Sequence, residues 1–126
     1  MRHSKGGSMR KYLAVVAAAF LFNLTAAFAD PVGRYFVEGS DPGKPNNTYT
    51  GTVTVEQTGD TYSVVWLIGG TKFVGTGIGN KDFIAVSYRS GNNTGLALYG
   101  PKDGGWNGVW TYAGGTTMGV ERWVRR

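Results

Sequence analysis

The chain has 126 residues, with 13 Lys and Arg against 8 Asp and Glu, no Cys and one His. The lack of cysteine excludes a disulfide-stabilised scaffold, and a single histidine leaves no cluster at the spacing of a zinc site. The formal net charge of +5 informs about partners only if it belongs to the folded part of the chain.

The first 29 residues have the three parts of a secretory signal peptide. A basic pair, Arg10 and Lys11, precedes an apolar run from Tyr12 to Phe22, and an A-x-A cleavage site ends at Ala29. This order is that of a signal peptide, and the run is shorter than the roughly 20 residues of a membrane span. We therefore expect residues 1–29 to be removed, and the mature chain to be periplasmic or secreted without a membrane span.

Cleavage after Ala29 would leave residues 30–126, whichever of Met1 and Met9 is the start. Four of the 13 basic residues precede residue 30, so nine remain against eight Asp and Glu, a net charge of +1. This balance argues against a nucleic-acid partner, which requires a basic surface. By its length the mature chain is a single domain.

From residue 32 onward the signals are those of strands and turns. Segments rich in Val, Thr, Tyr and Trp alternate with clusters of Gly, Asn and Asp, a pattern typical of an all-β sandwich or barrel. The predicted strands are Val32–Glu38, Thr48–Gln57, Thr61–Ile68, Thr71–Gly79, Phe83–Tyr88, Thr94–Tyr99, Trp106–Tyr112 and Thr116–Val124. Because eight short-looped strands can close on themselves, we expect an antiparallel up-and-down barrel, with a sandwich as the alternative.

The connections are short and rich in residues that adopt positive φ, such as Gly69-Gly70 and Asn80-Lys81. Tight hairpin turns require such residues. The longest predicted connection is Gly39–Asn47, which contains Pro42 and Pro45. We expect it to be a stiff, exposed loop.

One stretch occurs twice, at a spacing of 44 residues. Trp66–Gly75 returns as Trp110–Gly119, and Gly51 and Gly95 lie 15 residues before the respective tryptophans. An internal period of this length predicts two copies of one supersecondary unit. Strands two to four would form one copy, and strands six to eight the other.

Alternation along the strands assigns mainly aromatic residues, valines and glycines to the inner face of the barrel. The inward set is Tyr35, Val37, Tyr49, Gly51, Val53, Val55, Tyr62, Val64, Trp66, Ile68, Phe73, Gly75, Gly77, Gly95, Ala97, Tyr99, Gly108, Trp110, Tyr112, Gly119, Glu121 and Trp123. From it we select a candidate ligand-binding set: Tyr35, Tyr62, Trp66, Trp110, Tyr112 and Glu121.

Glu121 is the only charged member of the inward set, and a buried charge needs a partner. It is either salt-bridged or exposed at the rim, or it is a polar contact for a ligand at the mouth of the barrel.

The outer face also carries apolar residues, which are not expected on a surface in contact with water alone. They are Val65, Leu67, Val74, Ile78, Leu96, Leu98, Val109, Met118 and Val120. Either a homo-oligomer covers this face, or the assignment of faces is shifted by one residue in the second half of the chain.

The mature chain offers little chemistry. Without His or Cys it has no Ser-His or Cys-His nucleophile, and no spacing of Glu38, Glu56 and Glu121 singles out a glycosidase pair. The run Gly75–Gly79 lacks the following helix and lysine of a phosphate-binding loop, so it is interpreted as a bent strand. We expect no enzyme, no catalytic residue, no metal and no cofactor.

Several short motifs resemble those of small exported proteins of α-proteobacteria. Some of these proteins are labelled fibronectin- or fibrinogen-binding-like, and others carry no functional label. The matching motifs are Gly33-x-Tyr35, Tyr49-x-Gly51-x-Val53, Gly59-x-x-Tyr62-x-Val64-x-Trp66, Gly75-x-Gly77, Ala85-Val-Ser-Tyr88 and Gly108-x-Trp110 with Gly119-x-Glu121. The resemblance implies an exported protein that binds a protein partner.

The expected barrel also resembles the calycins, the class of lipocalins and avidins, in which an N-terminal Gly-x-Trp packs near a C-terminal Arg. Here Tyr35 replaces the Trp, and Arg122 would supply the Arg. The biotin-binding tryptophan pattern of avidins is not recognisable. This resemblance implies a carrier of a small ligand.

Three functions follow from these observations. The first is a non-enzymatic binding module for a protein or surface partner, acting through its outer face and loops. The second is a calycin-like carrier with a small apolar ligand in the barrel. The third is a hydrolase inhibitor that presents a loop such as Ser40–Asn47.

Overall fold

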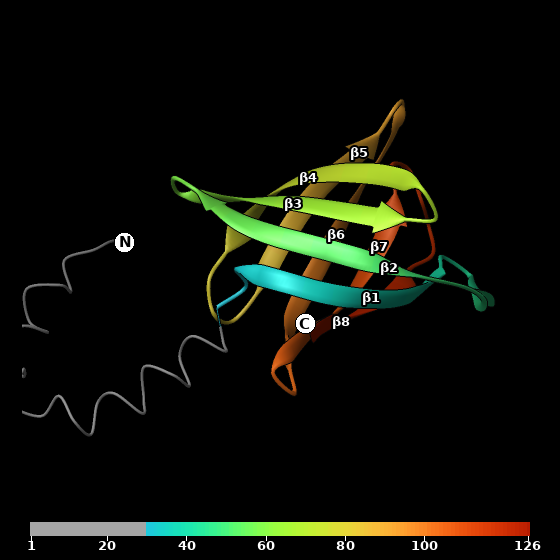
Figure 1. Cartoon of the computed structure of the whole chain (residues 1–126). Helices are drawn as coiled ribbons and strands as arrows, with labels where there is room; N and C mark the ends of the chain where they lie inside the picture. Colours follow the sequence, from blue (N-terminus) through green and yellow to red (C-terminus); the bar gives the residue numbers. More distant parts are fainter. Residues whose placement is uncertain (1–29) are drawn as a thin grey trace, which may run out of the picture.

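A computed structural model describes residues 30–126, which form one closed antiparallel barrel with strands in the order β1 to β8 (Figure 1). The strands are β1 (Gly33–Asp41), β2 (Lys44–Thr58), β3 (Thr61–Ile68), β4 (Thr71–Gly79), β5 (Ile84–Ser90), β6 (Asn93–Lys102), β7 (Gly105–Tyr112) and β8 (Gly119–Arg125). The predicted all-β, up-and-down architecture is confirmed. The predicted signal peptide lies outside the described residues.

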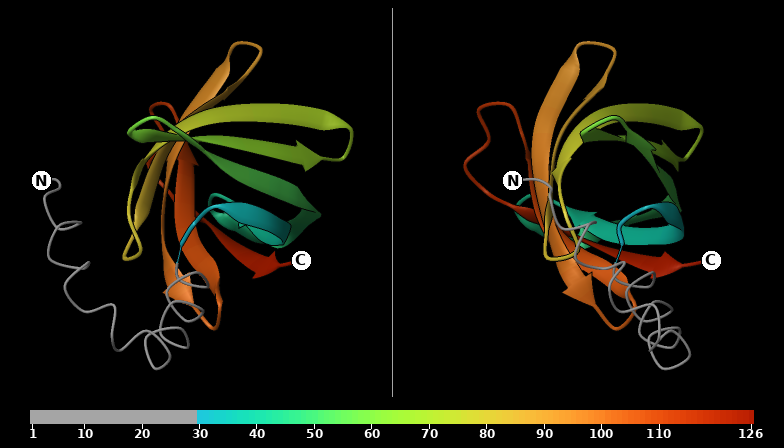
Figure 2. Two further views of the ribbon diagram at one scale, coloured as in Figure 1. Left: turned by 60° about the vertical axis from the view of Figure 1, so that its left-hand side comes forward. Right: turned by 90° about the vertical axis from the view of Figure 1, so that its left-hand side faces the viewer.

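The first and last strands close the barrel by pairing with each other. The β1–β8 ladder runs from Tyr35 opposite Arg125 to Ser40 opposite Val120, and the right-hand view of Figure 2 shows the strands as a ring about a common axis. Closure pairs the backbone of all eight strands on both sides, which removes the free sheet edges that promote aggregation. Within residues 30–126 there is no helix of the length and apolar character needed to cross a membrane.

The prediction of a long exposed loop at Gly39–Asn47 is wrong. Strand β1 continues to Asp41 and β2 begins at Lys44, so only Pro42 and Gly43 form the turn. Gly43 has φ +71°, the conformation that the third residue of a type II turn requires after proline. The pairing jumps between Ser40 and Asp41, and the bulge on β2 accommodates Pro45, because proline is tolerated where the ladder is interrupted.

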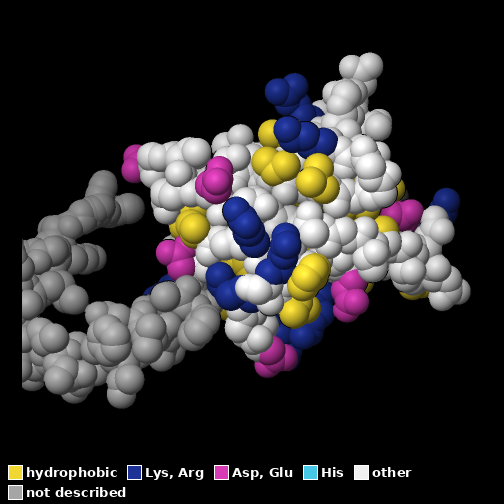
Figure 3. Space-filling view, viewed as in Figure 1, with side chains coloured by type: hydrophobic (Ala, Val, Ile, Leu, Met, Phe, Trp, Pro, Cys, Tyr) yellow, Lys and Arg dark blue, Asp and Glu magenta, His cyan; other side chains and the backbone are white. Residues whose placement is uncertain are grey.

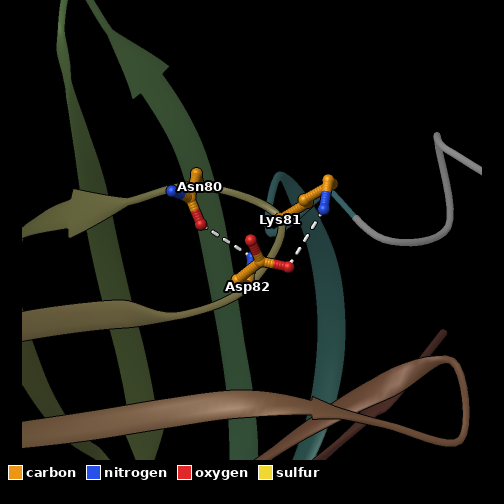
Figure 4. A network of polar contacts seen from close by, with 3 residues as sticks. All are labelled: Asn80, Lys81 and Asp82. Carbon is orange, nitrogen blue, oxygen red and sulfur yellow. Dashed lines mark hydrogen bonds and ion pairs between the residues drawn. The ribbon is translucent and has the colours of Figure 1, made fainter. Parts of the chain in front are cut away.

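Two other connections are longer than predicted. Strand β8 begins at Gly119 rather than Thr116. Between β4 and β5, the Asp82 amide donates to the Asn80 side-chain oxygen at 2.7 Å, and Lys81 pairs with Asp82 at 3.1 Å (Figure 4). Both partners of this ion pair are exposed, so the pair shapes the loop without contributing much to stability.

The structure confirms the inward face predicted for β1 to β4 and for β6 to β8. The buried core consists of Tyr35, Val37, Val53, Val55, Tyr62, Val64, Trp66, Ile84, Val86, Tyr88, Ala97, Tyr99, Trp106 and Trp123. Apolar side chains of the opposite face, such as Leu67, Ile78 and Leu98, are exposed. The alternative of a shifted face assignment is therefore wrong, and the outer apolar residues do lie on the surface.

The end of the barrel that carries both termini is filled with side chains and held closed by contacts between the two terminal segments; we call it the strapped end. The Tyr35 hydroxyl donates to the Pro31 carbonyl at 2.7 Å, and the Arg125 guanidinium lies 4.8 Å from the Tyr35 ring centre. Arg125 also donates to the carbonyls of Val32 and Asp30. The assignment of Arg122 to this role is wrong, because Arg122 lies on the outward-facing parity of β8, whereas Arg125 shares the inward parity.

The two segments of the predicted repeat agree in their first hairpin. Gly51 lies opposite Ile68, and 44 residues later Gly95 lies opposite Tyr112. In the second hairpin the pairing differs, since Gly75 lies opposite Val64 whereas Gly119 lies opposite Trp110. The longer connection before β8 accompanies this shift, and the origin of the two segments by duplication stays a prediction.

Candidate ligand-binding site

A cavity of about 370 Å³ lies at the end of the barrel opposite the termini. This is the end where the β1–β2, β3–β4, β5–β6 and β7–β8 connections turn. The residues that line it are mostly aromatic: Tyr49, Trp66, Phe73, Tyr88, Tyr99, Trp110 and Tyr112, together with Asp41, Ile68, Asn93, Ala97 and Glu121. The volume falls within the range of about 300 to 1,000 Å³ that is usual for small-molecule pockets.

Glu121 lies at the floor of this cavity, with 6% of its surface exposed. The next inward residue of β8, Trp123, belongs to the filled half and does not line the cavity. Glu121 therefore separates the packed half of the barrel from the open half.

Four neutral donors bind the Glu121 carboxylate. Oε1 accepts hydrogen bonds from Trp66 Nε1 at 3.0 Å, Tyr99 Oη at 2.6 Å and Trp123 Nε1 at 2.8 Å. Oε2 accepts one, from Tyr49 Oη at 2.6 Å. The donors come from β2, β3, β6 and β8, so one side chain cross-links strands on different sides of the lumen. Such donors compensate for the lost hydration of a buried carboxylate.

Of the two alternatives for Glu121, the salt-bridged or rim-exposed form is not what the structure shows. The carboxylate is buried, and among residues 30–126 it has no Lys or Arg partner. Its partners are tyrosine hydroxyls and indole N–H groups. A search of the sequence for oppositely charged residues does not identify these neutral donors. Contact with a ligand remains open to experiment.

The tyrosines around Glu121 are held in their protonated form. Burial raises the pKa of Tyr99 well above its ordinary value of 10.0, and the adjacent Glu121 charge raises it further. The same two causes raise the pKa of Tyr49. Burial, with smaller effects of Tyr112 and Glu121, raises the pKa of Tyr88 to about 12. All three remain hydroxyl donors at neutral pH.

The walls of the cavity are rings set nearly perpendicular to one another. Trp66 and Trp110 each meet Tyr88, with centroid separations of 6.0 and 6.2 Å and interplanar angles of 66° and 68°. Tyr49 meets Trp110 at 76° and Phe73 meets Tyr88 at 76°. Edge-to-face pairs of this kind fix the ring positions, so the walls are pre-formed.

Four of the six residues selected from the sequence come together in this cavity, namely Trp66, Trp110, Tyr112 and Glu121. Tyr112 is 48% exposed at the mouth. The other two, Tyr35 and Tyr62, are buried outside the residues that line the cavity. Tyr35 lies instead under Arg125 at the strapped end.

Selection from the sequence missed four aromatic residues of the cavity: Tyr49, Phe73, Tyr88 and Tyr99. Tyr49 and Tyr99 belong to the inward set but were not distinguished from the core, although they donate to Glu121. Tyr88 has the inward parity of β5 together with Ile84 and Val86. The same alternation applied to this strand would have identified Tyr88.

Two further features concern the chemistry of residues 30–126. No group of three or more His, Cys, Asp or Glu side chains in this range is arranged to hold a metal ion. The Nε1 donors of Trp106 and Trp110 are buried without a hydrogen-bond partner in this range.

Neither a scan against protein-family models nor a search of curated proteins gave a match for this chain.

Replacing Glu121 by Ala should lower the free energy of unfolding by about 3 kcal/mol or more, because several buried donors lose their acceptor. Denaturant unfolding followed by tryptophan fluorescence measures the change. Glu56→Ala, at an exposed position of β2, is the matched control and should change stability by about 0.5 kcal/mol or less. Equal stability of the two variants would contradict the described network.

A second prediction concerns alkaline pH. The pKa is raised in every tyrosine of residues 30–126: Tyr35, Tyr49, Tyr62, Tyr88, Tyr99 and Tyr112. The unfolded chain releases these phenol protons near pH 10, while the folded chain retains them to higher pH. The contribution of the protonated tyrosines to the free energy of unfolding should therefore be fully present below about pH 10 and be lost as the pH rises above it. As the pH is raised, phenolate absorbance should appear at a higher pH in the folded protein than in the urea-unfolded protein. Coincident titration curves would contradict the prediction.

Proposed function

We propose that this protein is an exported, non-enzymatic, calycin-like binding protein that holds a small ligand in the open end of its barrel. The observation that carries the proposal is the aromatic cavity of about 370 Å³ above Glu121. The proposed location is the periplasm or the medium, in line with the signal peptide expected at residues 1–29.

The division of the lumen supports a binding role. Trp106 and Trp123 are completely or almost completely buried in the filled half, whereas the open half keeps a cavity among rings that could pack together. Large aromatic side chains contribute on the order of 2–3 kcal/mol each when fully buried. Leaving several of them around an open cavity forgoes part of that contribution, which is understandable where a ligand completes the burial.

The strapped end supports the calycin-like classification. In the calycins an N-terminal Gly-x-Trp packs near a C-terminal arginine, and here Gly33-x-Tyr35 packs against Arg125. The tyrosine is the departure from that pattern, and its hydroxyl adds a hydrogen bond to Pro31.

The proposal is tested by filling the cavity. Ala97 is 4% exposed and lines the cavity, so Ala97→Phe should weaken binding of a neutral apolar dye such as N-phenyl-1-naphthylamine by about tenfold or more. Titration followed by dye fluorescence and by quenching of Trp66 and Trp110 measures the affinity. Ser87→Phe, at an exposed outward position of the neighbouring strand and outside the apolar residues named below, is the control and should bind the dye as the unmodified protein does. Equal loss of dye binding in both variants would contradict the proposal, and so would failure of the unmodified protein to bind this dye and small aromatic probes alike.

A specific surface feature favours a second candidate, binding of a protein or surface partner. Five apolar residues on β4 to β8 lie directly opposite one another in successive ladders, and we call them the outer apolar band: Ile78, Ala85, Leu98, Val109 and Val120. The face over β1 to β4 differs, since its apolar side chains form small groups between Lys and Arg (Figure 3). Contiguous exposed apolar surface is typical of an interaction site.

The candidate partners are a second copy of the chain and a matrix protein of the kind named by the resemblance, so the test measures both. Leu98→Lys should abolish any self-association in sedimentation experiments and any capture on immobilised fibronectin or fibrinogen. Leu67→Lys is the control, because Leu67 is 53% and Leu98 50% exposed but Leu67 lies on β3, outside the band. A monomer without affinity for either protein would contradict this candidate.

The hypothesis of a hydrolase inhibitor depended on a loop at Ser40–Asn47. Most of these residues lie in β1 and β2, so the described structure gives this hypothesis no specific support.

A further inference from the structure

The cavity has a one-sided charge. Its lining includes two carboxylates, Glu121 at the floor and Asp41 at the mouth, and no Lys, Arg or His. Asp41 accepts a hydrogen bond from Asn47 Nδ2 at 3.0 Å. No cation among residues 30–126 pairs with either carboxylate. A ligand that enters this cavity therefore meets two negative groups whose hydrogen-bond partners are neutral.

The two oxygens of Glu121 are unequally occupied. Oε1 accepts three hydrogen bonds, while Oε2 accepts only that of Tyr49. A carboxylate oxygen has about two lone-pair sites, so Oε2 retains capacity for one more donor. Glu121 itself lines the cavity, so this less occupied oxygen is the acceptor that the carboxylate can offer to a ligand.

The rings of the walls have the chemistry that recognises a cation. Trp66, Tyr88 and Trp110 stand nearly perpendicular to one another in succession, so that ring faces and edges alternate around the space. Trp and Tyr faces attract ammonium groups through their quadrupole, most strongly where water is excluded.

From these observations we propose that the ligand is an organic ammonium, a protonated amine on an apolar or aromatic body, with its N–H group directed at Glu121 Oε2. This inference rests on the proposed function, since it names the ligand class of the same cavity. A neutral apolar ligand would remove water from the carboxylate without replacing the lost interaction, which is costly. A cation replaces it and is stabilised by the surrounding rings.

Benzylammonium and benzyl alcohol are suitable probes, because they share the same ring and differ in charge. At neutral pH we expect isothermal titration calorimetry to show benzylammonium binding about tenfold or more tightly than benzyl alcohol. Glu121→Gln removes the negative charge and should reduce this ratio to about threefold or less, because the affinity for benzylammonium should fall by more than the affinity for benzyl alcohol.

A second variant keeps the test valid should Glu121→Gln fail to fold. Tyr49→Phe removes the one donor from Oε2, so the oxygen is less compensated and benzylammonium should bind about threefold or more tightly than to the unmodified protein. A merely structural role of Glu121 and Tyr49 would not change the ratio of the two affinities in this direction.

The outcomes separate this inference from the proposed function. If both probes bind equally, or if the neutral dye binds and benzylammonium does not, the cavity is a ligand site and the ammonium inference is overturned. If the dye and both probes all fail to bind, the proposed function falls together with the inference. The inference is supported if benzylammonium binds more tightly than benzyl alcohol and if Tyr49→Phe increases this difference.

Discussion

The structure depends on one buried carboxylate and the four groups that donate to it. An unpaired charge inside an aromatic lumen would be strongly destabilising, yet Glu121 is held by two tyrosine hydroxyls and two indole N–H groups from four strands. Its network has the role that a disulfide has in many small exported domains, because it connects distant parts of the chain in a protein without cysteine. Unlike a disulfide, it connects them through the centre of the barrel.

This network also divides the barrel into two halves with different tasks. Below it, Trp106, Trp123 and Tyr35 fill the interior, and Arg125 covers Tyr35. Above it, a ring of aromatic side chains leaves a cavity. The packed core lies at the end with both termini, and the proposed ligand site lies at the opposite end, so changes in the mouth need not disturb the core.

Much of this architecture follows from sequence pattern, for identifiable reasons. A period of two along each strand determines the inner face, and turn glycines such as Gly69 and Gly91, both with positive φ, determine where strands end. The pattern fails at Gly39–Asn47, because prolines usually indicate a loop, whereas here a two-residue turn and a bulge accommodate them. It failed for Arg122 because the parity of β8 was not applied to the arginines.

The candidate site was only partly predictable. Alternation along the strands predicts that Trp66, Trp110 and Glu121 point inward. Whether these side chains come close to one another depends on the strand register around the closed barrel. Trp66 and Glu121 are 55 residues apart, and Tyr49 and Glu121 are 72 apart. No local rule connects such positions. The cavity itself results from how far seven rings from six strands reach into the lumen, a distance that a linear pattern does not contain.

Strand β8 supplies both the seam with β1 and the acceptor at the centre of the lumen. Until it docks, β1 has an unpaired backbone edge and the donors of β2, β3 and β6 lack their acceptor. Assembly therefore waits for the final segment of the polypeptide, a strongly non-local order that slows folding. If the chain is exported through a translocation channel from its N-terminus, as proposed, this order would delay completion of the barrel until β8 has emerged, and would so keep the chain competent for transport.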